Sequence, residues 1–333
     1  EVDPVAGNTE YECGPVNTLV DGTYYFHVRA IDSVGNKSEP QTLKFVVDTI
    51  APALTMEKPA LVEETRWATI RPTVEIKAVE TGSGLDKAST VFEVLDSADK
   101  KVLGAEGWTG MVWTWAPNAD LTGCTVYTVK MKVKDMAGNE AEQTWQFKVD
   151  DDEPTISGLV PDNDTWTNKP LKSDAVTSGY LTISAVFEDS EGCSSGVDGK
   201  TAQMWVDGHQ IKLDDGNFTR DAGGVSYTPT KLRKGRNIPV KVEVKDHAGN
   251  VATAEWHFHY DPDTPELSEE SPDTWTNNKR PVVSVKVKQT VSGLDLEACT
   301  FEVKKDGTKV DGTTKWNGDV WEWRPEKDLA ECT

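Results

Sequence analysis

Runs in which every second residue is apolar occur in pairs along the chain, and a short turn rich in Gly and Asn separates the members of each pair. The turns share the pattern Asp-x-x-Gly-Asn and span residues 32–36, 135–139 and 246–250. Successive side chains of a β-strand point to opposite faces, so an alternating run buries one face and exposes the other. Each pair of runs therefore predicts a β-hairpin with one buried face. The apolar positions before the turns are Tyr24, Phe26, Val28 and Ala30; Tyr127, Val129, Met131 and Val133; and Ile238, Val240, Val242 and Val244.

The hairpins belong to a larger repeat of about 100 residues. Each one is followed by an Asp with a Pro four residues later, as in Asp48 and Pro52, and the same spacing follows Asp150 and Asp261. Segments rich in Asp and Pro are typical of linkers between domains. The sequence thus predicts complete repeats at residues 49–150 and 151–261, the N-terminal part of a repeat at 262–333 and the C-terminal part of one at 1–48.

The order of the shorter motifs inside a repeat indicates the fold class. A Trp and a Pro follow each linker, then a strand-like run, a Ser-Gly-x-Asp motif and a further strand. About seven short strands with turns between them and no helical period are the pattern of a sandwich. We therefore expect an all-β protein of tandem immunoglobulin-like antiparallel β-sandwiches, elongated in arrangement.

The motifs also resemble a known class of repeats. The segment 19–30, the Asp-x-x-Gly-Asn turns and the Asp-x-x-x-Pro linkers are similar to bacterial immunoglobulin-like and fibronectin type III-like repeats of large adhesin-type surface or extracellular proteins. This resemblance implies an extracellular, secreted or cell-surface location, and a role as a stalk, a spacer or a binding module in cell adhesion. Tyr24 and Tyr127 match the tyrosine corner of such domains, whereas Ile238 departs from it.

Composition narrows the range of partners. The formal net charge is −21, which argues against nucleic acid or an anionic membrane as partner because both would repel the chain. No run of 18 apolar residues is present, so no membrane insertion is expected. The five Cys form no CxxC pair, which speaks against zinc and thioredoxin-like sites, and the odd number prevents complete pairing within the chain. Buried free thiols are the expected state, although Cys299 and Cys332 could form a bridge.

Acidic residues near the linkers could bind calcium at the domain junctions. In an immunoglobulin-like sandwich, two of the loops lie at the same end as the incoming linker, and Ca²⁺ takes 6–8 oxygen ligands. The alternative is that these residues only close turns through local hydrogen bonds. The candidate ligands are Asp48, Glu80, Asp86, Asp135 and Asn139 at the first junction, and Asp150, Asp151, Asp152, Asp189, Asp198, Asp246 and Asn250 at the second.

The aromatic and histidine residues suggest core packing rather than chemistry. Large aromatics are the main core filler of small domains, so we expect the recurring Trp residues to be buried. They are Trp67, Trp166 and Trp275, and the pairs Trp113 and Trp115, and Trp321 and Trp323; Trp108, Trp205 and Trp316 are better candidates for exposure. His257 and His259 alternate with core residues and should face solvent, where a metal site would lack a third ligand. No His lies in a motif with a Ser or Cys nucleophile, so no catalytic residues are predicted and the chain should not be an enzyme.

Repetition without a unique polar cluster favours a non-catalytic structural spacer or stalk of a bacterial cell-surface or secreted adhesin-type protein. A glycan- or host-protein-binding module is an alternative, and so is an accessory region of an extracellular glycoside hydrolase. The expected partners are neighbouring repeats of the same protein. The two partial repeats also predict head-to-tail self-association, in which residues 1–48 of one copy complete residues 262–333 of the next.

Overall fold

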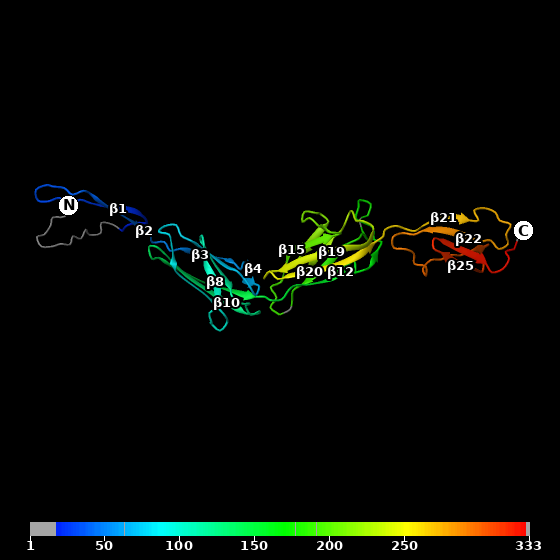
Figure 1. Ribbon diagram of the computed structural model, residues 1–333, viewed down its shortest axis with the longest axis horizontal. Coiled ribbons are helices and arrows are strands. Elements are labelled where there is room, and N and C mark those ends of the chain that lie inside the picture. Colours follow the sequence, from blue (N-terminus) through cyan, green and yellow to red (C-terminus); the bar gives the residue numbers. More distant parts are fainter. Residues whose placement is uncertain (1–17, 63, 177, 191, 331–333) are drawn as a thin grey trace. The chain divides into compact units, whose positions relative to one another are not determined.

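The computed structural model describes residues 18–62, 64–176, 178–190 and 192–330. These residues form β-strands joined by turns and loops, and none of them lies in a helix. No helix of this part of the chain is long and apolar enough to cross a membrane. The described residues divide into two compact units, some of whose strands are labelled in Figure 1: the first extends to Asp152 and takes in the short segments 192–195 and 247–250, and the second takes in the rest.

The first unit contains one hairpin and one sandwich. Strands β1 (Gly22–Val28) and β2 (Gln41–Val47) form the predicted hairpin, but its apolar face is exposed rather than buried. One sheet of the sandwich has the strand order β3-β6-β9-β8, and the other has the order β4-β5-β11-β10-β7. The bounds are β3 Ala53–Lys58, β4 Leu61–Val62, β5 Thr65–Ala68, β6 Val74–Val79, β7 Leu85–Leu95, β8 Gly104–Thr109, β9 Val112–Pro117, β10 Val126–Asp135 and β11 Glu140–Val149.

The second unit repeats this plan. Its sandwich pairs a sheet of order β12-β14-β18-β17 with one of order β13-β20-β19-β15-β16. A further sheet of order β21-β22-β26-β25 and the short pair β23-β24 follow it. The bounds are β12 Thr155–Val160, β13 Trp166–Thr167, β14 Ile183–Glu188, β15 Val197–Val206, β16 His209–Gln210, β17 Phe218–Asp221, β18 Gly224–Tyr227, β19 Gly235–Asp246, β20 Val251–Tyr260, β21 Glu266–Ser271, β22 Val283–Lys288, β23 Lys304–Lys305, β24 Thr308–Lys309, β25 Gly312–Asn317 and β26 Val320–Pro325.

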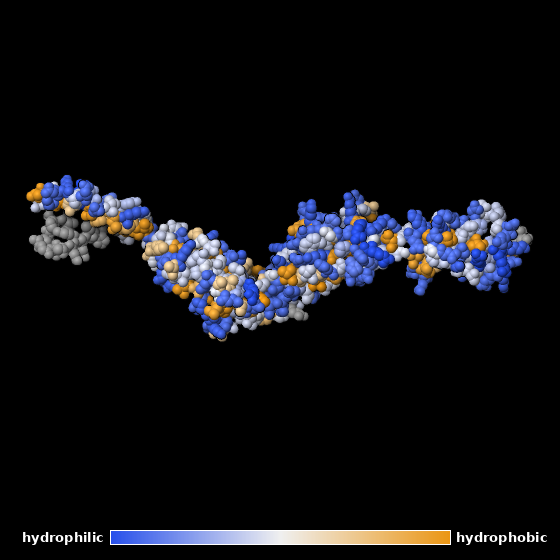
Figure 2. All heavy atoms as spheres, in the orientation of Figure 1, coloured by the Kyte–Doolittle hydropathy of each residue, from blue (hydrophilic) through white to orange (hydrophobic). Residues whose placement is uncertain are grey.

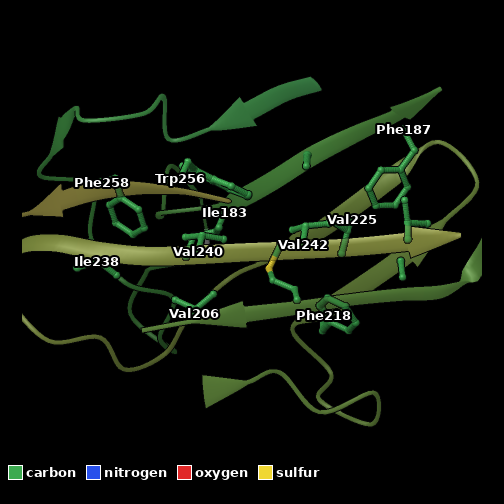
Figure 3. Packing of buried hydrophobic residues seen from close by; sticks show 14 of the residues in the cluster. Ile183, Phe187, Val206, Phe218, Val225, Ile238, Val240, Val242, Trp256 and Phe258 are labelled. Carbon is green, nitrogen blue, oxygen red and sulfur yellow. The ribbon is translucent and has the colours of Figure 1, made fainter. Parts of the chain in front are cut away.

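Each complete sandwich encloses its own apolar core. In the second unit, Ile238, Val240 and Val242 alternate along β19 and belong to one buried cluster with Phe258 and Trp256 of the neighbouring strand β20 (Figure 3). A second core in the first unit contains Val129 and Met131 of β10, both fully buried. The predicted all-β fold of tandem β-sandwiches is thus confirmed, because the alternating apolar runs supply these cores.

The tyrosine corners agree with the sequence. The Tyr24 hydroxyl donates a 2.7 Å hydrogen bond to the Val20 carbonyl, and the Tyr127 hydroxyl accepts one of 2.9 Å from the Thr122 amide. Ile238, which occupies the equivalent position in the next repeat, is fully buried and fills the place with hydrocarbon alone.

The prediction for the recurring Trp residues is partly wrong. Trp115 and Trp323 are buried as expected. Trp275, however, is 90% exposed, and Trp166 is 37% exposed because it lies on the short strand β13 at the edge of its sheet. A Trp that recurs at the same place in each repeat therefore occupies an equivalent position, but its burial depends on the residues that pack over it.

The expectation of free buried thiols is also wrong for two cysteines. Cys124, in the loop before β10, forms a disulfide with Cys193, which lies 69 residues further along the chain and belongs to the same compact unit. Cys299 is a free thiol, but it is half-exposed rather than buried. Cys13 and Cys332 lie outside the described residues.

Candidate functional site

The Asp of each linker is held by the loop that contains the Ser-Gly-x-Asp motif. One carboxylate oxygen of Asp48 accepts a 2.6 Å hydrogen bond from the Ser83 amide, and the other accepts one of 3.2 Å from the amide of Ile50. Asp48 is 8% exposed, and Asp150 and Asp261 are equally well buried. The matching bonds join Asp150 to the amides of Ser195 (2.7 Å) and Asp152 (3.1 Å), and Asp261 to those of Ser292 (2.8 Å) and Asp263 (3.2 Å).

The Asp-x-Ala-Gly-Asn turn closes the same network in the first unit. Asn139 donates its side-chain amide to the Asp135 carboxylate at 2.7 Å and to the Asp48 carbonyl at 2.9 Å. The Ala137 amide donates to the Ser83 hydroxyl at 3.1 Å. We call this arrangement the junction network: a linker Asp, a loop Ser and a turn Asn. The network recurs around Asp150. There the Ser195 hydroxyl accepts a 3.0 Å hydrogen bond from the Ala248 amide, and the Asn250 side chain donates one of 3.0 Å to the Asp150 carbonyl.

Hydrogen bonding stabilises the charged form of these linker carboxylates. Hydrogen bonds from Ser83 hold the pKa of Asp48 below its usual value of 3.8. Burial alone would raise the pKa of Asp261, but hydrogen bonds from Thr290 and Ser292 outweigh it and lower that pKa to about 2. Both linker residues are therefore buried carboxylate anions, and hydrogen bonds from amide and hydroxyl groups stabilise their charge.

Three of the predicted calcium ligands come together in the first unit. Carboxylate oxygens of Asp48, Glu80 and Asp135 lie within 4.8 Å of one another, and Asn139 is bonded to two of these residues. Glu80 also accepts the amides of Gly82 at 2.6 Å and Gly84 at 2.5 Å. The group offers carboxylate oxygens of the kind that Ca²⁺ prefers, but each side chain already closes a loop.

The other predicted ligands contact nearby loops and strands, and two of them also approach each other. The carboxylate of Asp198 accepts the Lys200 amide at 3.1 Å, and Asp86 lies in the β7–β10 ladder opposite Lys134. In the second unit, Asp189 and Asp246 bring carboxylate oxygens within 4.8 Å of each other. Asp151 is exposed and lies against Gly123, and Asp152 lies against Gly192.

A histidine cluster in the second unit was missed. His259 is only 5% exposed, so the expectation that it faces solvent is wrong; His257 is half-buried. Both share one face of β20, and Asp164 from the loop before β13 reaches them. The spacing of the two His residues in the sequence indicated two of the three ligands. The carboxylate could not be found from sequence because it comes from a loop more than ninety residues earlier.

A groove lies on the same sheet, beside strands β15, β19 and β20. Its volume is ≈ 460 Å³, and Trp205, Lys241, Glu255 and His257 contribute to its lining. The ammonium group of Lys241 lies 5.1 Å from the centre of the Trp205 ring. Trp205 is half-buried, so it is accessible in part, as its irregular place in the repeat suggested.

Comparisons with known proteins give structural similarities alone. No family model and no curated protein sequence matches the chain. Among solved structures, the fibronectin(III)-like modules of Clostridium thermocellum CbhA match with a TM-score of 0.39 and 16% identity, over 62% of this chain and 94% of that one. A segment of titin matches with a TM-score of 0.27 and 13% identity, over 74% and 77%. The human desmocollin-1 ectodomain matches with a TM-score of 0.24 and 12% identity, over 93% and 60%. These comparisons assign no activity to the chain.

Proposed function

We propose that this chain is a non-catalytic spacer of a bacterial adhesin-type protein, secreted or attached to the cell surface. The observation that carries the proposal is the junction network, which is present at Asp48 and at Asp150 with the same three residue types. Each linker Asp is anchored in the loops that follow it, so the linker has little freedom where it meets the next repeat. A spacer requires an anchored linker at every junction between repeats. A catalytic site, by contrast, would occur at one place in the chain and would not need to recur.

The disulfide supports an extracellular location. Disulfides persist in oxidising compartments and are rare in the cytosol. By sequence, Cys124 belongs to the repeat 49–150 and Cys193 to the repeat 151–261, so the bond is a covalent tie between two consecutive repeats. We expect this bond to limit the conformations open to the segment between the two Cys residues, which includes the linker 150–154.

Small-angle X-ray scattering of the full chain tests the proposal. We expect an extended particle whose maximum dimension changes little with salt, and a broader distribution of dimensions after reduction of the disulfide. The Cys299→Ser variant should scatter like the wild type and serves as the control. A compact particle in both redox states would contradict the spacer function.

We propose in addition that the cluster of Asp48, Glu80 and Asp135 binds Ca²⁺. Three carboxylates within 4.8 Å of one another repel each other unless a cation or a hydrogen-bond donor offsets the charge. A calcium ion would offset it and would stiffen the first junction further. The proposal of a spacer does not depend on this ion, because the hydrogen bonds already connect the same residues.

A binding module is the second candidate, and the groove beside Trp205 favours it. Aromatic rings with polar groups nearby suit the apolar faces and hydroxyl groups of a sugar. A glycan array probed with wild type and with Trp205→Ala tests this function. Binding that is lost in the variant would support it, and a blank array for the wild type would count against it.

A further inference from the structure

We propose that Asp164, His257 and His259 form a binding site for a divalent transition-metal cation, with Zn²⁺ as the representative ion. The ligand atoms already converge on one point. One oxygen of Asp164 lies 2.8 Å from Nε2 of His259 and 3.2 Å from Nε2 of His257. All three ligand atoms lie within 4.8 Å of one another.

These distances are close to those of an occupied site. Zinc binds His nitrogen and carboxylate oxygen at about 2.0–2.2 Å, so tetrahedral ligand atoms lie roughly 3.4 Å apart. A small rotation of Asp164 supplies the difference, and that carboxylate is free to move because its side chain is 70% exposed. The two imidazoles stay in place, because they project from the same face of one strand.

Backbone hydrogen bonds fix the loop that carries the carboxylate. The Asp164 amide donates to the His257 carbonyl at 2.7 Å, and the His259 amide donates to the Thr165 carbonyl at 2.8 Å. The side chain of Asn163 accepts the His257 amide at 3.1 Å. The three candidate ligands are therefore held together before any ion binds, which lowers the entropy lost on binding.

The surroundings shape the His259 ring further. Trp166 packs against it with ring centres 4.8 Å apart, and Arg236 covers Trp166 at 4.9 Å. Nδ1 of His259 accepts the Asn237 amide at 2.9 Å, so in the metal-free chain the ring hydrogen lies on Nε2 and points at Asp164. A cation bound at Nε2 requires the neutral ring to carry its hydrogen on Nδ1 instead, and Nδ1 can then no longer accept the hydrogen bond from the Asn237 amide. We expect weaker binding than in a structural zinc site with four ligands.

The ligand set selects the class of ion. Two imidazoles and one carboxylate suit Zn²⁺, Cu²⁺ or Ni²⁺, whereas Ca²⁺ takes six to eight oxygen ligands. Three protein ligands also leave one coordination position open to water or to a donor from another molecule. This site is separate from the carboxylates of Asp48, Glu80 and Asp135 in residues and in ion type.

Calorimetric titration of the full chain with ZnCl₂, after removal of metal by EDTA, tests the site. We expect one saturable site per chain that excess Ca²⁺ does not displace. His257→Gln and Asp164→Asn should each weaken binding by about tenfold or more, since even outer-shell changes cost 10–100-fold. Asn is chosen at position 164 because the backbone there has a positive φ of 59°, a conformation that Asn adopts readily. His209→Gln is the matched control, because its ring lies in the same unit outside the cluster and should leave binding unchanged.

A Co²⁺ titration provides a second measurement, because its visible absorption reports coordination number. A tetrahedral or five-coordinate spectrum that His257→Gln abolishes would support the site. His259→Gln removes a buried ring and could unfold the sandwich, so the two less buried ligands, Asp164 and His257, carry the test. The proposal is overturned if the wild type binds no zinc saturably, if Ca²⁺ displaces the zinc, or if both ligand variants bind it as tightly as the wild type.

Discussion

The side-chain amide of Asn139 donates a 2.9 Å hydrogen bond to the backbone carbonyl of Asp48, 91 residues earlier in the chain. Through this bond the turn between β10 and β11 holds the linker that begins the repeat. We expect Asn139→Ala to lower the free energy of unfolding of the first unit by about 1–3 kcal/mol, because it leaves buried acceptors on Asp48 and Asp135 without a donor. Urea denaturation followed by tryptophan fluorescence measures the change.

Asn36→Ala is the control for that variant. The Asn36 side chain donates the equivalent 2.8 Å hydrogen bond to the Asp32 carboxylate within an exposed turn. The hydrogen bond described for this side chain does not reach a linker. Its loss should cost clearly less. Equal effects of the two variants would show that the turn alone matters, and that the bond to the linker adds nothing.

The second unit should lose stability in acid. The pKa of Asp261 is about 2 in the folded chain against an unperturbed 3.8, so its ionised form stabilises the fold above pH 3.8. That contribution disappears as the pH falls from about 4 toward 2. Calorimetric melting across pH 2–7 should show a smaller acid-induced fall for Asp261→Asn than for wild type. The exposed Asp273→Asn should follow the wild type, and identical profiles for all three chains would contradict the assignment.

Calcium should raise the melting temperature of the first unit if the three carboxylates bind it. With a dissociation constant of about 10⁻⁴ M, as in extracellular modules, 10 mM Ca²⁺ should stabilise by about 3 kcal/mol. Glu80→Gln should abolish the response to Ca²⁺, whereas Glu106→Gln on β8 should retain it. A wild type whose melting temperature is the same in Ca²⁺ and in EDTA would remove the proposal.

Reduction of the Cys124–Cys193 disulfide should destabilise the chain. A bond that closes a long loop contributes about 2–4 kcal/mol, mainly by restricting the unfolded state. Cys193→Ser should therefore melt lower than wild type under oxidising conditions and like it after reduction, while Cys299→Ser should behave as wild type in both. Mass spectrometry of non-reduced peptides checks the pairing directly, and its absence would refute the assignment.

We also expect the chain to associate with itself through the β1–β2 hairpin. Tyr24 and Phe45 stack at 5.5 Å, as Tyr127 and Phe147 do at 5.4 Å. The second pair is buried, whereas Phe45 is 38% exposed, and apolar residues reach the surface of the hairpin (Figure 2).

Sedimentation velocity at increasing concentration tests this association. Phe26→Lys changes the apolar face of the hairpin, and we expect it to abolish a concentration-dependent increase in sedimentation coefficient. Val34→Lys, in the exposed turn, should not. A monomeric wild type at high concentration would contradict the prediction.

Alternation predicted the three hairpins, because a strand side chain must point to one side or the other, and it predicted the buried faces of β10–β11 and β19–β20 but not the exposed face of β1–β2. It failed at His259, where Phe258 and Tyr260 on either side are also buried. The Trp166 ring of β13 packs against His259 there, and the Asp164 carboxylate from the preceding loop reaches its Nε2. Parity along a strand identifies a face, but the segment that covers this face comes from elsewhere in the chain.

The junction residues were partly predictable for a related reason. The repeats marked Asp48, Asp135 and Asn139 as equivalent positions, and the structure brings them together. The backbone amide of Ser83, which donates to the Asp48 carboxylate, carries no side-chain signal, although the recurring Ser-Gly-x-Asp motif marks its place. The disulfide could not be predicted, because it requires two loops to approach each other and the spacing of Cys residues in the sequence does not show this.

In each sandwich a short early strand runs parallel to the last one: β5 beside β11, with Ala68 opposite Val149, and β13 beside β20, with Thr167 opposite Tyr260. Tension applied to the two ends of a sandwich pulls such strands past each other along their length. The hydrogen bonds between them are then loaded together instead of opening one after another. We expect a domain built in this way to resist stretching more strongly than one whose end strands separate one hydrogen bond at a time.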